Sequence, residues 1–336
     1  PVASTPPQAG ERLNVAPGSR TLLARGERAL HLITPSRLGR LTHADVETGR
    51  VVNDFSFVRE GVEDYGVADI CNETKTAQLE DRSTFLGLSS KSLLRWDTRL
   101  KGGLAQEMTS PAVECLGGKS YKLSESSGFT CMATSADGYV AVGARDGRVR
   151  LYSERTLTQA RTSIPGLGAP ITGIDVTFDG QWVVATTARY LMVLLTTYRD
   201  PDTGNTRCGF TSRLGADAPA PRVLRLRPED VARTGGAALE KAHFSWVTDA
   251  GRPERWIVAS VGNYSVLWNF RSVKTASPEA LSLGGLTTVT QYNLIAKQDA
   301  VVDAKFMHDR FARVSGRGDS AMVVATKSKV YSLEED

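Results

Sequence analysis

Short apolar runs separated by tight turns recur along most of the chain. The clearest case is residues 129–152, which predict three β-strands joined at Asp137-Gly138 and Asp146-Gly147. An Asp-Gly pair between two apolar runs favours a hairpin, because glycine adopts positive φ at little cost. A three-stranded meander of this size cannot bury its own apolar face, so such units are expected to pack against one another.

The same layout occurs again on both sides of this stretch. Residues 67–100 and 171–198 each contain three apolar runs with polar turns between them. The third runs align at residues 93–97, 149–153, 265–269 and 329–333. A period of about 40 to 45 residues with four strands per unit is typical of a β-propeller. The sequence therefore predicts an all-β, WD40-like β-propeller of six to seven four-stranded blades.

The pattern divides the chain into a Pro-rich linker at residues 1–19 and a propeller at residues 20–336. The predicted blades cover residues 21–57, 67–108, 129–164, 170–214, 223–296 and 301–333, the fifth with a helical or irregular detour at residues 228–242. The last blade has three strands in the sequence. We expect a strand from the N-terminal side, near Leu13 to Val15 or upstream of Pro1, to complete it. A seventh blade built partly from residues 117–127 is an alternative.

Composition and charge exclude some function classes. A net charge of +4 is too small to indicate nucleic-acid binding by itself. No apolar run reaches the roughly 18 residues of a membrane span. The cysteines form no CxxC pair that would indicate structural zinc, so free thiols in a reducing compartment are expected; they are Cys71, Cys115, Cys131 and Cys208. The first residues lack a signal peptide, and a fragment of a longer cytoplasmic or nuclear protein is expected.

Several stretches carry a family resemblance. They are residues 84–100 (TFLGLSSKSLLRWDTRL), 138–153 (GYVAVGARDGRVRLYS), 170–187 (PITGIDVTFDGQWVVATT), 254–270 (ERWIVASVGNYSVLWNF) and 45–52 (DVETGRVV). They resemble the C-terminal domain of the vacuolar import and degradation twenty-seven family, whose plant members are the defective embryo and meristems proteins. The resemblance implies a WD-like propeller downstream of a pleckstrin-homology-like domain in a larger cytosolic eukaryotic protein, plant or algal. It implies no catalytic residues.

Candidate chemistry in the sequence is sparse. No GxSxG elbow is present, and the glycine-rich stretches do not open a helix, so neither nucleophilic catalysis nor a phosphate loop is expected. Trp96-Asp97 is the one WD dipeptide, so the usual blade network of WD repeats is not predicted. Asp69, Asp175 and Asp303 each lie in a predicted first strand. We expect them to accept hydrogen bonds from neighbouring turn backbone, and a ligand role stays the alternative. No enzyme activity, cofactor or metal is predicted.

The turns between strands show a charge pattern. Turns that join second to third strands, which emerge on one face of a propeller, carry Arg37, Arg40, Lys91, Arg145, Arg148, Arg189, Lys327 and Lys329. Turns on the opposite face carry Glu80, Asp81, Asp137, Asp179, Asp249, Glu254 and Asp319, and only residues 24–29 (ARGERA) are basic there. Ordinary polar turns explain this pattern equally well. The functional interpretation is a scaffold for protein–protein interaction whose basic face binds an acidic partner.

Two alternatives from other classes stay open. The same basic face is suited to anionic lipid headgroups or nucleic acid, although few aromatic residues accompany its bases for stacking on single strands. A metal-dependent hydrolase propeller would need a metal in the central channel. A small-molecule substrate is not expected.

Overall fold

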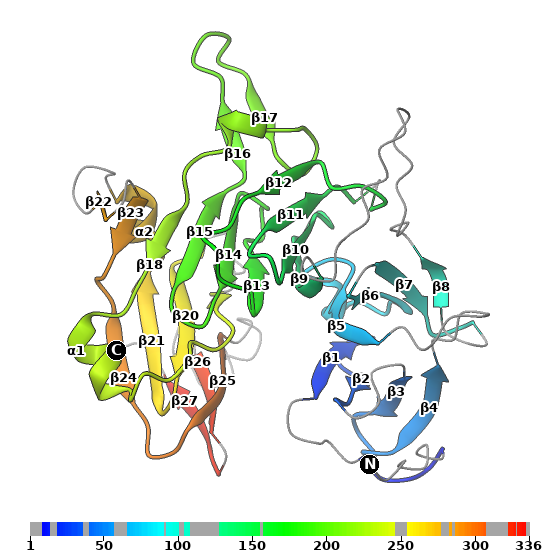
Figure 1. Ribbon diagram of the computed structural model, residues 1–336. Coiled ribbons are helices and arrows are strands. Elements are labelled where there is room, and N and C mark those ends of the chain that lie inside the picture. The colour runs from blue at the N-terminus through cyan, green and yellow to red at the C-terminus, as the bar shows by residue number, and fades with distance from the viewer. Residues whose placement is uncertain are drawn as a thin grey trace, which may run out of the picture. The chain divides into compact units, whose positions relative to one another are not determined.

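The computed structural model describes most of the predicted strands (Figure 1). The described residues are 9–13, 19–35, 40–56, 66–90, 92–100, 104–107, 128–154, 157–245, 254–276, 282–283, 286–306, 322–326 and 328–333. The chain divides into two compact units. The first comprises Pro1–Val140 and Ser153–Ala160, and the second comprises Ala141–Tyr152 and Arg161–Asp336.

The first unit contains the first two predicted blades. One antiparallel sheet has the order β1 (Arg20–Ala24), β2 (Ala29–Ile33), β3 (Arg40–Asp45) and β4 (Val51–Ser56). The next has the order β5 (Val67–Asn72), β6 (Thr84–Ser89), β7 (Leu93–Asp97) and β8 (Leu104–Glu107). A short 3-10 helix (Ala77–Leu79) lies between β5 and β6, and strand β9 (Phe129–Thr134) follows. The predicted blades at residues 21–57 and 67–108 are confirmed.

Aromatic packing holds the two sheets of the first unit together. Phe85 and Trp96 stack with ring centroids 6.2 Å apart, and both belong to a buried cluster with Ile33 and Leu41 of the first sheet. Gly87 is required beside them, because a Cβ there would lie 2.5 Å from the Trp96 Nε1 atom. The indole of the one WD dipeptide is therefore a core side chain.

The N-terminal segment pairs with the first sheet. The Leu13 amide donates to the Gly49 carbonyl at 2.9 Å, and the Val51 amide donates to the Glu11 carbonyl at 2.8 Å. The Leu13 amide is thus bonded to the turn before β4, while Val15, at the other end of the expected closing strand, lies outside the described residues. Residues 14–18 and 109–127, including the region of the possible seventh blade, lie outside the described residues.

The second unit contains the remaining strands. They are β10 (Val140–Ala144), β11 (Val149–Tyr152), β12 (Thr162–Ile164), β13 (Gly173–Val176), β14 (Trp182–Thr186), β15 (Leu191–Leu195), β16 (Thr197–Arg199), β17 (Thr206–Cys208), β18 (Arg222–Leu224), β19 (His243–Phe244), β20 (Trp256–Val261), β21 (Tyr264–Asn269), β22 (Ser282–Leu283), β23 (Leu286–Val289), β24 (Asn293–Ala296), β25 (Val301–Phe306), β26 (Met322–Thr326) and β27 (Val330–Leu333). The helices are a 3-10 turn (Gly215–Asp217), α1 (Pro228–Arg233) and α2 (Phe270–Thr275).

Three sheets of this unit begin with consecutive antiparallel strands, as a blade does, and in the first of them β23 adds in parallel to β18. Their orders are β13-β14-β15-β18-β23-β22, β19-β20-β21-β24 and β25-β26-β27. In the part of the chain that the structure describes, the strands thus fall into six successive groups, the third being β9 of the first unit and β10 to β12 of the second. Gly138 and Gly147, after the two predicted hairpin aspartates, have φ of 79° and 82°, as the Asp-Gly turns require.

The outer strand of the fourth blade differs from the prediction. Residues 208–214 were expected to supply it, but β16 and β17 pair with each other in a hairpin that extends away from β15 (Figure 1). On the side away from β14, β15 pairs with β18, with Leu191 opposite Leu224. The apolar residues Phe210 and Leu214 are buried without forming a strand, so their hydrophobicity reflects core packing and does not indicate an outer strand. Consequently Val223 and Leu224 end the fourth blade and do not begin the fifth.

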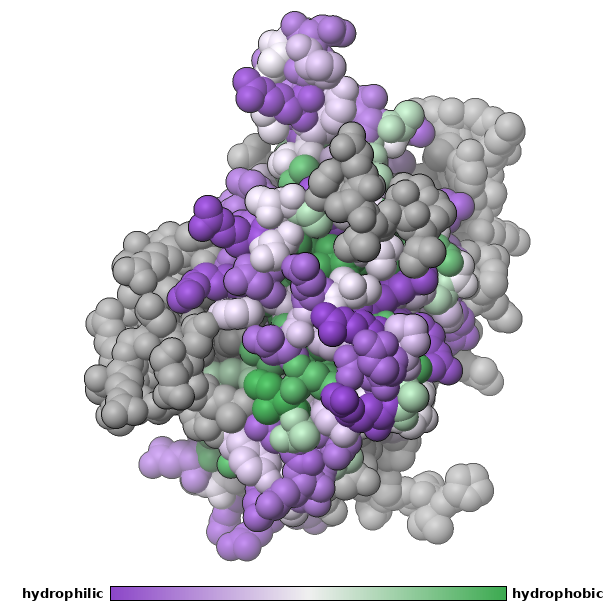
Figure 2. Space-filling model, turned by 90° about the vertical axis from the view of Figure 1, so that its left-hand side faces the viewer, coloured by the Kyte–Doolittle hydropathy of each residue, from purple (hydrophilic) through white to green (hydrophobic). Residues whose placement is uncertain are grey.

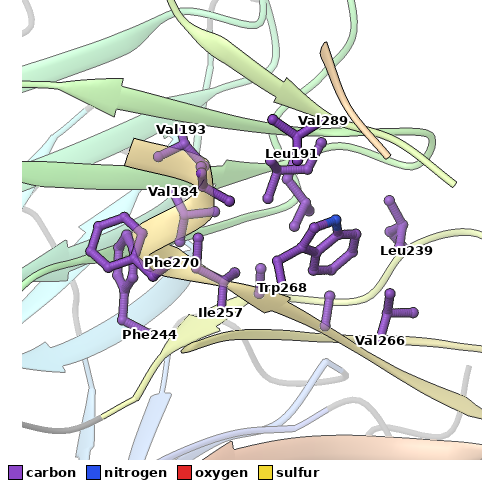
Figure 3. Close-up of a cluster of buried hydrophobic side chains, with 14 of the residues drawn as sticks. Val184, Leu191, Val193, Leu239, Phe244, Ile257, Val266, Trp268, Phe270 and Val289 are labelled. Carbon is purple, nitrogen blue, oxygen red and sulfur yellow. The ribbon is translucent and has the colours of Figure 1, made fainter. Parts of the chain in front are cut away.

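The core of the second unit is built around Trp268. Figure 3 shows its indole among Leu191, Leu239 and Val289, while the rings of Phe244 and Phe270 lie together, with centroids 5.0 Å apart. These side chains come from β15, β19, β21, β23 and α2, and Leu239 comes from the segment between α1 and β19. The helix and hairpin inserted before β24 therefore contribute core residues, although the sequence predicted only a loop there.

Candidate functional site

The first-strand aspartates serve backbone pairing. Asp69 accepts hydrogen bonds from the Ile70 amide at 3.1 Å and from the Met132 amide of β9 at 3.0 Å. Asp175 accepts from the Val176 amide at 2.8 Å and from the Phe244 amide of β19 at 2.9 Å. The structural role predicted for these two residues is confirmed, but the donors are amides of first strands and not of turns.

His243 lies between two of these strands. Its Nδ1 is 3.9 Å from Asp175 Oδ2, and its Nε2 is 3.8 Å from Asp303 Oδ1. Asp303 also accepts a hydrogen bond from the Ala304 amide at 2.9 Å. Within the described residues, no group of three His, Cys, Asp or Glu side chains is placed to hold a metal ion.

The turns between second and third strands lie along one edge of the second unit. Each turn is hydrogen-bonded to the segment that leads into the next sheet. The Ile171 amide donates to Ala144 O at 3.2 Å, the Leu239 amide to Ala188 O at 3.0 Å, and the Val301 amide to Gly262 O at 2.8 Å. Lys329, before β27, donates to Gln298 Oε1 at 3.4 Å and so places the last turn beside the same segment.

We call the cations on these turns the basic edge. Its members are Arg145, Arg148, Arg189 and Lys329, and all four are exposed. Asp146 neutralises part of this charge, since its Oδ2 lies 3.3 Å from Arg150 Nη2 and 3.8 Å from Arg148 Nε. Arg189 Nη1 donates to Gly236 O at 3.3 Å and keeps its charge at the surface.

Two further cations extend the basic edge. Arg225, directly after β18, lies over the Tyr190 ring at 5.5 Å from its centroid, next to Arg189 in the chain. Lys297 lies over the Tyr331 ring at 5.0 Å, and burial lowers the pKa of its amine. The sequence analysis missed both. Arg225 was missed because residues 223–226 were assigned to the start of a blade, although bases alternate with apolar residues in LRLRP.

No contact among the described residues places the other predicted basic residues on this edge. Arg40 belongs to the first unit, where its Nη1 lies 3.0 Å from Asp54 Oδ2. Arg37, Lys91 and Lys327 lie outside the described residues.

Most carboxylates of the predicted acidic turns that the structure describes have ion-pair or hydrogen-bond partners. Glu80 pairs with Arg82 at 2.6 Å, and Asp81 pairs with Arg25 at 3.3 Å. Glu254 is buried and accepts a hydrogen bond from the Phe178 amide at 2.5 Å. Asp249 and Asp319 lie outside the described residues. Most of the acidic turn residues that the structure describes therefore serve local structure.

The face of the second unit that Figure 2 shows is mostly polar. Figure 2 shows the side on which Figure 1 places α1, where hydrophilic residues surround a small hydrophobic area. Among the described residues there is no helix long and apolar enough to cross a membrane.

The successive antiparallel sheets and their shared turn edge define a WD40-like β-propeller. A solved structure with this fold is the β-propeller domain of Cps50 (Swd1) from Myceliophteria thermophila. It matches with a TM-score of 0.57 at 12% identity, over 94% of this chain and 82% of that chain. At this identity the likeness shows the fold alone.

The family model of the VID27 C-terminal WD40-like domain matches residues 8–332, and the chain belongs to this family. It is 28% identical to vacuolar import and degradation protein 27 of Schizosaccharomyces pombe over 316 residues, which is 91% of this chain and 36% of that protein. The protein of the same name from Saccharomyces cerevisiae is 28% identical over 261 residues, 76% of this chain and 31% of that protein. The chain thus spans about a third of the length of these relatives. Both are yeast proteins, so they do not support the expected plant or algal source.

Proposed function

We propose that this domain is a non-catalytic scaffold that binds an acidic segment of a protein partner through the basic edge. The observation that carries the proposal is the row of exposed cations on three of the four turns of this edge, Arg145, Arg148, Arg189 and Lys329. Arg225 enlarges this row beside Tyr190. Carboxylates of an acidic segment would pair with these cations.

Rigidity of the turns favours this use. Backbone hydrogen bonds of 2.8–3.2 Å fix three of the turns to the neighbouring segments, so little order is lost when a partner binds. Clustered like charge raises the rate of association with an oppositely charged partner, and the effect falls with salt. Arginine side chains add bidentate pairing with carboxylates.

The relatives suggest the setting. They are longer proteins named for vacuolar import and degradation, and this domain would supply their partner-binding part. We place the domain in the cytoplasm or nucleus, because the free cysteines of the described residues fit a reducing compartment.

A charge-reversal variant tests the proposal. We expect R145E/R148E/R189E to retain the fold and to bind the partner captured from native extract about 30-fold more weakly at low salt. Three exposed ion pairs at roughly 0.7 kcal/mol each correspond to about 2 kcal/mol. The measurement is affinity capture followed by titration of the captured partner, and the difference from wild type should shrink at high salt.

The matched control is R199E/R213E/R271E. It makes the same change in net charge at exposed positions outside the basic edge. Equal losses in both variants would show only a net-charge effect and contradict the proposal. Capture of nucleic acid or anionic vesicles, with no protein, would contradict it in favour of the alternative ligands.

A further inference from the structure

A pocket with polar and apolar walls lies in the first unit, away from the basic edge in sequence and in a different unit. Its volume is about 400 Å³. Arg25, from the turn between β1 and β2, and Arg99, from the segment after β7, both line it. Asn53 and Phe55 of β4 form another part of the wall. Pockets of this size hold small ligands, and the few polar groups that line them determine which ones.

Two arginines of this wall keep hydrogen-bond donors that no described residue uses. Arg99 donates Nε and Nη2 to Asp97, at 3.0 and 2.7 Å, and this pairing lowers the pKa of Asp97 to about 2. Arg25 donates Nε to Asp81 at 3.3 Å. Among the described residues, no hydrogen bond involves Arg99 Nη1 or the two Nη atoms of Arg25. Asn53 Oδ1 accepts from the Asp54 amide at 2.8 Å, and its Nδ2 is a further donor in the wall.

The charge balance around the pocket is positive. Asp81 is shared between Arg25 at 3.3 Å and Arg28 at 3.4 Å. Among the charged residues that line the pocket, two are arginines, Arg25 and Arg99, and one is a carboxylate, Asp81. Arg25 and Arg28 are the bases of residues 24–29, the one turn of its set that the sequence showed to be basic.

The turn that carries Arg25 is held in a costly conformation. Arg25 and Glu27 have φ of 55° and 65°, and Gly26 between them has φ of 63°. Left-handed backbone costs a non-glycine residue energy, and such strain is common where a side chain must be held for a ligand. The Gly26 amide donates to Glu80 O at 3.1 Å and secures the turn. The wall also has an apolar part, Val52 and Phe55.

We propose that this pocket binds a small phosphate monoester. The phosphate oxygens accept hydrogen bonds from Arg25, Arg99 and Asn53 Nδ2. The organic part packs against Val52 and Phe55. Arginine is suited to this role because its planar fork matches the oxygens of a phosphate group.

Calorimetric titration of the whole chain tests the proposal, with phenyl phosphate as the probe and inorganic phosphate for comparison. We expect phenyl phosphate to bind at least about tenfold more tightly than inorganic phosphate, because only it reaches the apolar wall. Vesicles containing phosphatidic acid form a third arm. Binding of phenyl phosphate supports a soluble ligand, and binding of vesicles alone supports a lipid headgroup with the same chemistry. Binding of neither would overturn the proposal.

Three variants locate the site. R99Q removes a guanidinium from the pocket, and N53D places a carboxylate where the amide stood while keeping the oxygen that the Asp54 amide needs. Each should weaken binding at least about tenfold. R28Q removes the same charge from the same region without lining the pocket, and should weaken binding less than about threefold. Thermal melting confirms that the variants fold. Equal effects of R28Q and N53D would overturn the proposal.

Discussion

Replacement of Asp175 by alanine is expected to lower the free energy of unfolding of the second unit by about 3 kcal/mol. The carboxylate accepts the Val176 and Phe244 amides at 2.8 and 2.9 Å and so joins β13 to β19. Both donors lie in buried strands, and each buried amide left without an acceptor costs roughly 1–3 kcal/mol. Urea denaturation followed by tryptophan fluorescence measures the change, since Trp182, Trp256 and Trp268 all report on this unit.

Asp179 provides the control for this variant. It is exposed in the turn after β13, and its hydrogen bonds with described residues lie within that turn, from Thr177 Oγ1 at 2.7 Å and the Gln181 amide at 2.9 Å. Because water replaces these bonds, Asp179→Ala should cost less than about 1 kcal/mol. An Asp175→Ala variant as stable as Asp179→Ala would show that the carboxylate does not join the strands.

The first unit is expected to lose stability as the pH falls below about 6.5, the ordinary pKa of histidine. Burial, with smaller contributions from the charges of His43 and Arg25, lowers the pKa of His31 to about 3. Between these values the unfolded chain binds a proton at His31 that the folded unit does not bind. The free energy of unfolding therefore has its full value above pH 6.5. Below that pH it falls by at most about 1.4 kcal/mol per pH unit, down to pH 3.

The His31→Phe variant isolates this contribution. His31 is buried, stacks on Phe85 at a centroid distance of 4.4 Å, and its Nδ1 has no hydrogen-bond partner in the described part of the chain. A phenyl ring fills the same space without titrating, so the stability at pH 7 should change little. Urea denaturation at pH 7, 6 and 5 should give a shallower pH dependence for the variant. Identical slopes in both proteins would show that His31 does not protonate on unfolding.

Much of the fold follows from local patterns. The hairpins at Gly138 and Gly147 depend on positive φ next to an aspartate, which the sequence displays directly. The period of the apolar runs located the first two blades to within a few residues, because each strand there is buried on the face that its neighbours cover. The WD40-like β-propeller prediction is therefore confirmed.

Strand pairing in the folded protein, and not the local sequence pattern, determines which segment lies beside β15. Residues 208–214 and 222–224 are both apolar enough to be the strand beside β15. Only the pairing of Leu191 with Leu224 selects the second, and Phe210 is buried without strand pairing. The helix α2 was missed as well, because its six residues contain buried Phe270 and Val273 in a stretch without a longer helical period.

The candidate sites were predictable to different degrees. The basic edge was found from the order of turns, since topology alone places Arg145, Arg148 and Arg189 on turns of the same kind. The pocket was not found, because Arg25, Asn53 and Arg99 come from three separate segments that only folding brings together. Arg225 was missed for a related reason, the wrong assignment of its strand.

Hydrogen–deuterium exchange of the domain, alone and with its captured partner, tests most directly where the partner binds. The proposal predicts slower amide exchange on binding in the turns at residues 144–148 and 187–190, and no change in the β16–β17 hairpin. Protection confined to the hairpin or to the first unit, with those turns unchanged, would contradict it.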